Sequence, residues 1–201
     1  MRNPIRRSRK IGLTQGGRVK GGRAYEKWSR VFTQDIWAKL SESDLKWQFL
    51  VENPSRDYYH PCSTDEIEQV LKLLPGTLTE NIRAIVLRRL PKLDEQRGVE
   101  ARKIYHCIIL NSFPRSRKYY WDRKPEMKTF HHFDHWCKNW YQKNDQWILE
   151  WRKEEIKRYY LYHLLLHEVG HFSQPEYFSR KKREDFAENF ALTWAQKLGQ
   201  L

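Results

Sequence analysis

One segment near the C-terminal end of the chain limits the possible folds more than any other. It reads HLLLHEVGHFSQ (residues 163–174), and its histidines, His163, His167 and His171, recur every four residues. On an α-helix this spacing gathers side chains on one face, because successive residues turn by about 100°. The surrounding leucines indicate that the same helix packs into a core. The sequence therefore predicts a packed helix with three imidazoles on one side.

The segment contains the pattern HEVGH, in which two histidines can hold one Zn²⁺ ion from adjacent helical turns. We predict that His167 and His171 are metal ligands. Glu168 follows His167 directly, and we expect it to act as a general base that takes a proton from a zinc-bound water. Gly170 lies inside this helix, where glycine costs about 1 kcal/mol relative to alanine. Its presence indicates that another element packs closely there.

A hydrolytic zinc site has three protein ligands and one water. Neither histidine nor cysteine follows His171, so a downstream third ligand has to be a carboxylate. The segment REDFAENFALTWA supplies Glu184 and Glu188, one helical turn apart. Small residues on or beside the same face would let this helix approach the HEVGH helix: Ala187, Ala191 and Ala195. By this reasoning one of the two glutamates binds the metal and the other hydrogen-bonds a liganding imidazole.

These two segments together resemble a known family. HExxH followed by EDFAENFA is similar to the gluzincin zinc metallopeptidases, in particular to the glutamate-bearing helices of the ImmA/IrrE peptidases and of the anthrax lethal factor peptidase domain. The resemblance covers residues 160–198 and implies a minimal zincin fold that hydrolyses peptide bonds. It implies Glu184 as the third metal ligand and Glu188 as its support. The connection from His171 to Glu184, twelve residues long, is shorter than in most gluzincins.

Other residues are weaker candidates for the same site. His163, one turn before His167, is expected to support the ligands from behind or to face the substrate, and a structural histidine is the alternative that its spacing alone favours. Tyr177 follows the metal helix and could steady an oxyanion in the transition state. Three more tyrosines are alternatives for that role: Tyr159, Tyr160 and Tyr162. The segment HHFDHWC offers a second metal group, but without a well-spaced partner elsewhere: His131, His135 and Cys137.

The whole chain is predicted to be an α+β protein in three parts. These are a flexible basic arm (1–27), a helical N-terminal region (28–80) and a zincin-like metallopeptidase core (81–201). Apolar spacing and capping signals predict helices near residues 28–50, 63–76, 151–172 and 180–198. In the core, a small antiparallel sheet is expected to pack on the HEVGH helix, with the last helix beside it.

The sheet is predicted from two apolar runs, 82–90 and 102–113, joined as an antiparallel hairpin with a long loop. By resemblance to zincins, the second run is the expected edge that pairs with an extended substrate. Residues 114–145 are dense in rings and cations. They predict a mobile flap, a basic-aromatic binding surface or an irregular cover over the core.

Charge is concentrated at the start of the chain. Of the net +13, residues 1–30 carry +9, from ten basic side chains and one acidic, which leaves +4 for the other 171 residues. Residues 2–30 could therefore attract nucleic acid or an acidic partner without sequence specificity. A disordered, solubilising tail is the alternative reading of the same composition. No stacking or base-reading motif accompanies these charges.

Cysteine usage and hydropathy point to the cell interior. Three cysteines lie far apart and form no CxxC pair, which favours a reducing compartment: Cys62, Cys107 and Cys137. No apolar run reaches the roughly 18 residues that cross a bilayer, and no secretory signal is apparent, so we expect a cytoplasmic protein without membrane partners.

Together these features predict a zinc metalloprotease that acts on an intracellular protein or peptide, with Glu168 as the general base. The alternative is a nucleic-acid-binding or adaptor protein in which the zinc site is structural or inactive.

Overall fold

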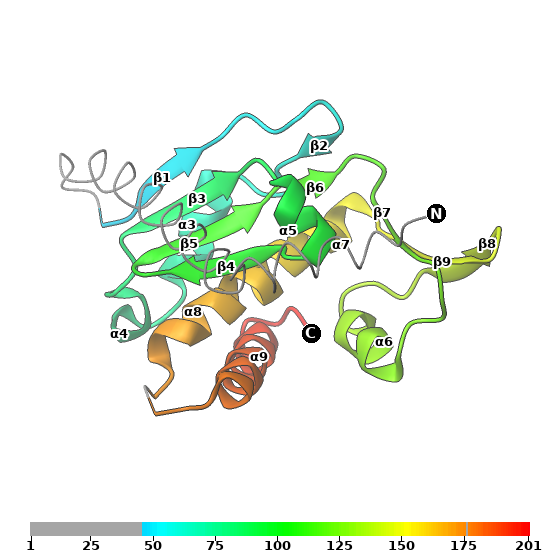
Figure 1. The fold of residues 1–201 in the computed structure, drawn as a ribbon. Coiled ribbons are helices and arrows are strands. Elements are labelled where there is room, and N and C mark those ends of the chain that lie inside the picture. Colours follow the sequence, from blue (N-terminus) through cyan, green and yellow to red (C-terminus); the bar gives the residue numbers. More distant parts are fainter. Residues whose placement is uncertain (1–45, 176) are drawn as a thin grey trace, which may run out of the picture. The chain divides into compact units, whose positions relative to one another are not determined.

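The computed structural model describes residues 46–175 and 177–201, which belong to one compact unit, residues 45–201. This unit mixes helices with small sheets, which confirms the α+β class (Figure 1). The predicted basic arm, and the predicted helix from residue 28 as far as residue 45, lie outside the described residues. No helix in the described part of the chain is long and apolar enough to span a bilayer.

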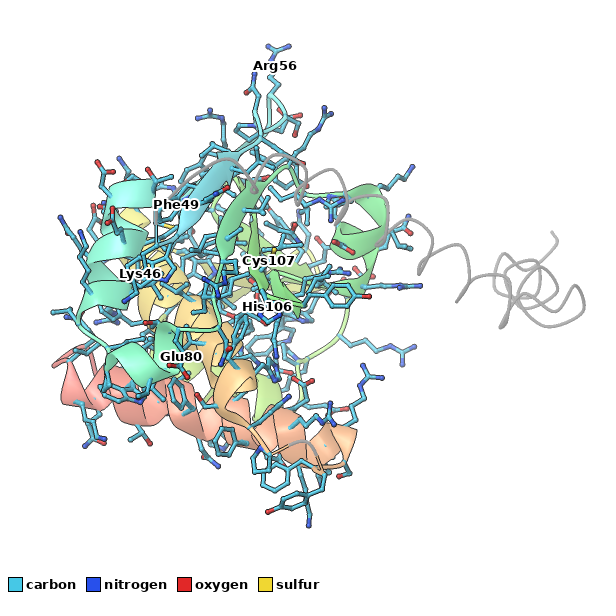
Figure 2. The ribbon with its side chains drawn as sticks, turned by 90° about the vertical axis from the view of Figure 1, so that its left-hand side faces the viewer. Lys46, Phe49, Arg56, Glu80, His106 and Cys107 are labelled. Carbon is cyan, nitrogen blue, oxygen red and sulfur yellow. The ribbon has the colours of Figure 1, made fainter. Side chains whose placement is uncertain are left out.

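The central sheet has the strand order β1-β3-β5-β4. Its strands are β1 (Gln48–Val51), β3 (Ala84–Arg88), β4 (Ala101–Ile104) and β5 (Cys107–Asn111). β1, β3 and β5 are parallel to one another, and β4 runs antiparallel to β5. In Figure 2, Phe49 marks β1 and Cys107 marks the start of β5.

The predicted antiparallel hairpin is therefore wrong. Its second run, 102–113, is broken at Tyr105, whose φ of 51° reverses the chain between β4 and β5. After β3, helix α5 (Lys92–Arg97) leads to β4 at the edge of the sheet, and β5 then enters between β3 and β4. The run predicted as a substrate-binding edge thus divides: β4 is an edge strand, and β5 is interior.

The predicted helical region 28–80 also needs correction. Residues 48–51 form strand β1 instead of the end of a helix, and β1 pairs with β3 in register from Gln48–Ala84 to Val51–Leu87. A short strand, β2 (Tyr58–Tyr59), pairs with β6 (Phe113–Pro114). The sheet therefore extends across the boundary expected near residue 80.

One helix of this region is present as the sequence predicts. Helix α3 (Thr64–Lys72) begins after Ser63, whose hydroxyl accepts from the backbone N–H of Glu66 while the Glu66 carboxylate accepts from the backbone N–H of Ser63. This capping box satisfies two donors that the helix end would otherwise leave free. The helix stops before Pro75, and the short α4 (Gly76–Thr79) follows.

Residues 114–145, together with the strand that follows them, contain a second sheet. Strands β7 (Lys118–Trp121), β8 (Trp140–Lys143) and β9 (Gln146–Glu150) are antiparallel in the order β7-β9-β8. Helix α6 (Met127–Asp134) packs its Phe133 ring against rings of this sheet and of the core. Phe133, Trp136 and Cys137 of this segment are buried in the core, as expected for a cover, although the segment is regular and not irregular. The flap and the binding surface stay predictions.

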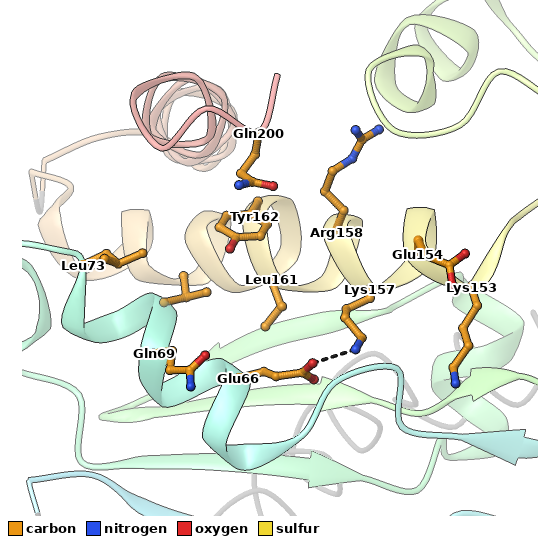
Figure 3. A pocket seen from close by; sticks show the side chains of 11 residues that line it. Glu66, Gln69, Leu73, Lys153, Glu154, Lys157, Arg158, Leu161, Tyr162 and Gln200 are labelled. Atoms are coloured by element: carbon orange, nitrogen blue, oxygen red, sulfur yellow. Dashed lines mark hydrogen bonds and ion pairs between the residues drawn. The ribbon is translucent and has the colours of Figure 1, made fainter.

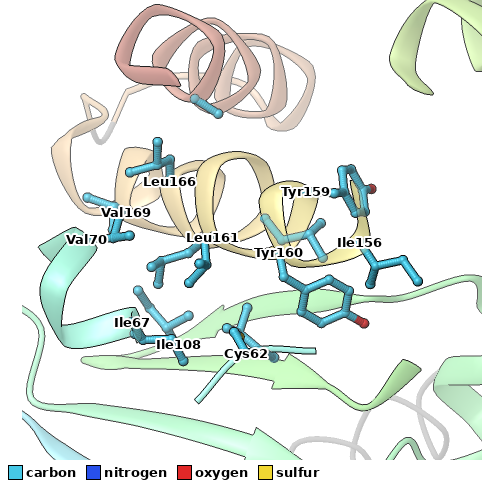
Figure 4. Packing of buried hydrophobic residues seen from close by; sticks show 14 of the residues in the cluster. Cys62, Ile67, Val70, Ile108, Ile156, Tyr159, Tyr160, Leu161, Leu166 and Val169 are labelled. Atoms are coloured by element: carbon cyan, nitrogen blue, oxygen red, sulfur yellow. The ribbon is translucent and has the colours of Figure 1, made fainter. Parts of the chain in front are cut away.

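The predicted helix 151–172 is present as one continuous helical run. It consists of α7 (Lys153–Tyr159), a π-helical turn η2 (Tyr160–Leu164) and α8 (Leu165–Ser173). Its apolar face packs on α3 and the central sheet, as Figure 4 shows. Buried residues of this core include Ile67, Val70, Ile108, Ile156, Leu161, Leu166 and Val169. The last helix, α9 (Arg180–Lys197), lies beside α8 and agrees with the predicted range (Figure 1).

Candidate metal centre

Helices α8 and α9 approach closely because small residues meet between them. A Cβ atom on Gly170 would lie 3.1 Å from the Ala187 Cα and 3.1 Å from the Phe190 Cβ. The alanines predicted to allow this approach, Ala187, Ala191 and Ala195, are all fully buried. Close packing of the two backbones lets short side chains on one helix reach side chains on the other. The glycine and the alanine stripe therefore set the width of the site.

Three predicted ligands come together where the helices meet. Oε2 of Glu184 lies 3.5 Å from Nε2 of His167 and 3.8 Å from Nε2 of His171. The imidazole rings of His167 and His171 are 4.9 Å apart between centroids. The structure thus places one carboxylate oxygen opposite two ring nitrogens that come from adjacent turns of α8.

These separations are too long for charge-assisted hydrogen bonds, which span about 2.7–2.9 Å. They are close to the spacing of ligands around one ion. With zinc–ligand bonds of about 2.0–2.2 Å, the edge of a tetrahedron is about 3.3–3.6 Å, because an edge is about 1.6 times the bond length. Two imidazoles and one carboxylate are also a donor set that zinc prefers at hydrolytic sites. Geometry and chemistry both fit a divalent transition-metal ion.

The second nitrogen of each ring also faces a side-chain oxygen. Nδ1 of His171 lies 3.0 Å from Oε1 of Gln174, so an N–H at Nδ1 donates to this amide oxygen and leaves the Nε2 lone pair free. Nδ1 of His167 faces Oε2 of Glu188 at 3.5 Å. Burial disfavours the charged form of His167, but Glu188 and the other nearby carboxylates outweigh burial and raise its pKa.

Glu168 also lies near the two histidines, with ligand atoms of all three within 4.8 Å of one another. Two carboxylates could therefore complete the set. We favour Glu184 as the ligand because its Oε2 faces both Nε2 atoms, whereas the Glu168 carboxylate is directed toward β4 and accepts a hydrogen bond from the backbone of Lys103. Glu168 is 5% exposed, and burial raises its pKa to about 7. Such a carboxyl group exchanges protons near neutral pH.

A cleft of about 960 Å³, hereafter the metal cleft, opens in front of these residues. One wall is the edge strand β4 with residues 101–103, and the opposite walls are α8 and the start of α9. The Lys103 side chain extends from β4 to α8, where its Nζ donates to the carbonyl oxygen of His171 at 3.0 Å. The cleft therefore has a strand edge on one side and the metal ligands on the other.

A second group of possible ligands lies beside the first. His132, His163 and Glu188 offer ligand atoms within 4.8 Å of one another. Burial lowers the pKa of His163 to about 3, so this ring is neutral at physiological pH. His163 and Glu188 were predicted as supporting residues, and the structure places both next to His167. His132 was not predicted, because it comes from α6, far from the motif in sequence.

Tyr177 is not brought to the site. Its side chain is 86% exposed and packs edge-on against Phe178, and it is not among the described residues that line the metal cleft. The predicted second metal group is also not formed. Neither of the two groups of possible metal ligands in the described part of the chain contains its residues, His131, His135 and Cys137. The neighbouring His132 takes that place, since it is the histidine on the inner face of α6.

Several buried polar atoms of this region have no hydrogen-bond partner among the described residues: Nδ1 of His163, Nδ1 of His167 and Oε2 of Glu168. Unsatisfied buried polar atoms are rare in folded proteins and mark functional sites when they gather in one place.

Comparison with protein-family models, curated proteins and solved structures gave no match for this chain.

Proposed function

We propose that this protein is a zinc-dependent peptidase that hydrolyses peptide bonds of an intracellular protein substrate. One observation supports this proposal above all others. The Glu184 carboxylate from α9 faces Nε2 of both histidines of the HEVGH motif, at 3.5 and 3.8 Å. A structural role for two histidines and a glutamate would favour direct hydrogen bonds, and these longer separations support a role as ligands of one ion.

In the proposed reaction, His167, His171 and Glu184 would hold Zn²⁺, and Glu188 would fix the ring of His167. A zinc ion in such a site supplies a Lewis acid that polarises a peptide carbonyl and acidifies water. Glu168 takes the proton of the attacking water and passes it to the leaving nitrogen. A pKa of about 7 suits both transfers, because the carboxylate accepts and then releases the proton near neutral pH.

Strand β4 is the proposed binding site for the substrate backbone. Its pairing with β5 uses one edge, and its other side lines the metal cleft. An extended peptide could add to this edge as a further strand, with main-chain hydrogen bonds that do not depend on sequence. The Glu168 carboxylate lies at this edge, where it accepts from the backbone of Lys103.

Zinc content and peptide hydrolysis together test the proposal. The full chain should cleave an unfolded test protein, with the products identified by mass spectrometry, and chelation of the metal should stop cleavage. His171→Ala and Glu184→Ala should each contain one zinc ion fewer than the wild type by elemental analysis. Asp185→Ala, at the exposed neighbouring position on α9, is the matched control and should keep both zinc and activity. Unchanged zinc content in Glu184→Ala would remove this residue from the ligand set.

A further inference from the structure

The ligand pattern of the proposed zinc site is repeated one helical turn away. His163 precedes His167 by four residues on the same helical run, and Glu188 follows Glu184 by four residues on α9. Because α8 and α9 pack together, the two shifts lead to the same place. There His132 of α6 supplies a second imidazole, whose ring centroid lies 4.8 Å from that of His163. The result is another set of two histidines and one glutamate.

The nitrogen–oxygen distances in this second set are similar to those in the first. Nδ1 of His132 lies 3.6 Å from Oε1 of Glu188, and Nε2 of His163 lies 3.6 Å from Oε2 of Glu188. Both separations exceed those of charge-assisted hydrogen bonds. Each is as long as the tetrahedral edge of about 3.3–3.6 Å expected around a zinc ion. The two contacts use different oxygens of one carboxylate, but one ligand atom from each of the three residues lies within 4.8 Å of the others, so one ion could reach all three.

The hydrogen bonds behind His132 determine which of its nitrogens carries hydrogen. The Tyr159 hydroxyl donates to Oε2 of Glu100 at 2.7 Å, and it lies 3.2 Å from Nε2 of His132. Because the single hydroxyl hydrogen is used on Glu100, Tyr159 can only accept from an N–H at Nε2 of His132. The neutral ring then presents a bare lone pair at Nδ1 toward the Glu188 carboxylate. Two acceptors facing each other require a cation between them or a proton on the ring.

The second set is also accessible and held in place. The side chains of His132 and Glu188 are about one-third exposed, at 34% and 33%, and His132, His163 and Glu188 all line the metal cleft. His163, by contrast, is 1% exposed and stacks on the Tyr159 ring at 5.0 Å. A site with a fixed buried imidazole and two ligands at a cleft wall can take up an ion from solution and keep one coordination position open.

We propose that His132, His163 and Glu188 bind a second divalent transition-metal ion, of the Zn²⁺ class, beside the site of His167, His171 and Glu184. Glu188 connects the two positions, since its Oε2 also lies 3.5 Å from Nδ1 of His167. The chain would then hold a pair of ions about one helical turn apart, near 5.4 Å along the helix axis. The inference goes beyond the proposed peptidase activity and does not require it.

The test measures how many ions each variant binds. The metal-free full chain is titrated with Zn²⁺ at neutral pH, unbound metal is removed, and zinc per chain is determined by elemental analysis. We expect two zinc ions for the wild type and one for His132→Ala. His171→Ala should also bind one, and the double variant His132→Ala/His171→Ala none. His131→Ala changes the exposed neighbour on α6 and should keep two.

These chains separate the two claims from each other. If the wild type binds one ion, and His132→Ala keeps it while His171→Ala loses it, the second site is refuted and the first remains. If the single ion is lost in His132→Ala and kept in His171→Ala, the second site stands and the proposed peptidase centre fails. Circular dichroism shows whether each variant is folded, and His132→Gln, which keeps a polar side chain, replaces His132→Ala if that variant unfolds. Two ions in both His132→Gln and the wild type would also overturn the proposal.

Discussion

Two clefts of this protein contain acidic and basic side chains, and they use them differently. In the cleft between α3 and α7, hereafter the α3 cleft, Nζ of Lys157 lies 2.6 Å from Oε1 of Glu66, a normal ion pair (Figure 3). In the metal cleft, Glu184 and Glu188 face imidazoles at 3.5–3.8 Å. In the α3 cleft this carboxylate and this ammonium group are in direct contact, with no space for an ion between them. The metal cleft has the wider spacing that ligands take around an ion.

The largest effect is expected from the general base of the metal cleft. Glu168→Gln should lower the rate of peptide hydrolysis by about 10²–10⁴-fold, because an amide cannot take the proton of the attacking water. Zinc content should stay at the wild-type value, since Glu168 is not a proposed ligand. Glu66→Gln in the α3 cleft is the matched control and should leave the rate unchanged. Undiminished turnover in Glu168→Gln would refute the assigned mechanism.

The next largest effect concerns the packing that brings the metal ligands together. Gly170→Ala should lower the free energy of unfolding by about 1–3 kcal/mol, because the added methyl group would press on the α9 backbone. This loss should appear although alanine favours a helix by about 1 kcal/mol over glycine. Gly76→Ala is the control, since a Cβ there meets no atom within 4 Å. Denaturant unfolding measures both, and equal stability of the two variants would contradict the close approach of α8 and α9.

A smaller effect is expected behind His171. Gln174→Ala removes the amide oxygen 3.0 Å from Nδ1 of His171, so the ring loses its orientation. Removing such a supporting hydrogen bond lowers metal affinity by about 10–100-fold. Competition with a chromophoric chelator gives the zinc affinity of each chain. Gln69→Ala, in the α3 cleft, should bind zinc as the wild type does, and a Gln174→Ala chain of wild-type affinity would mean that the hydrogen bond does not position the ligand.

The smallest effect belongs to the α3 cleft itself. Burial favours the neutral form of Glu66, but Lys157 and the helix N-terminus at Ser63 outweigh it, and the pKa of Glu66 is lowered. Because the folded pKa lies below the unfolded value, this stabilisation is present above the unfolded pKa and is lost as pH falls through the folded pKa. Glu66→Gln should therefore cost less than about 1 kcal/mol at neutral pH, and nothing once Glu66 is protonated in both states. Denaturant unfolding of the wild type and of Glu66→Gln, at neutral pH and at a pH low enough to protonate Glu66, measures this difference in stability. A difference that does not change with pH would exclude the ion pair as its cause.

The same contrast shows what the sequence could predict. HEVGH and the EDFAENFA helix are local patterns, so spacing predicted the two helices and the side chains that meet between them, while the choice of Glu184 over Glu188 as the ligand came from the family resemblance. The path of the sheet could not, because the position of β5 between β3 and β4 depends on a chain reversal at Tyr105. His132 was missed because it meets Glu188 only through the tertiary fold, and no sequence spacing relates α6 to Glu188. The predicted partners of residues 2–30 stay a prediction, since those residues lie outside the described part of the chain.

The π-helical turn at residues 160–164 sets the phase between the two halves of the long helix. A π-turn accommodates one more residue than an α-turn does, so deleting a single residue there would yield an uninterrupted α-helix. If the same residues wound as a regular α-helix instead, the extra residue would rotate everything upstream by about 100° relative to HEVGH. Tyr159 would then move away from His163 and His132, although no residue of the motif had changed. The wider winding of this one turn is therefore as strict a requirement for the site as the identity of its histidines.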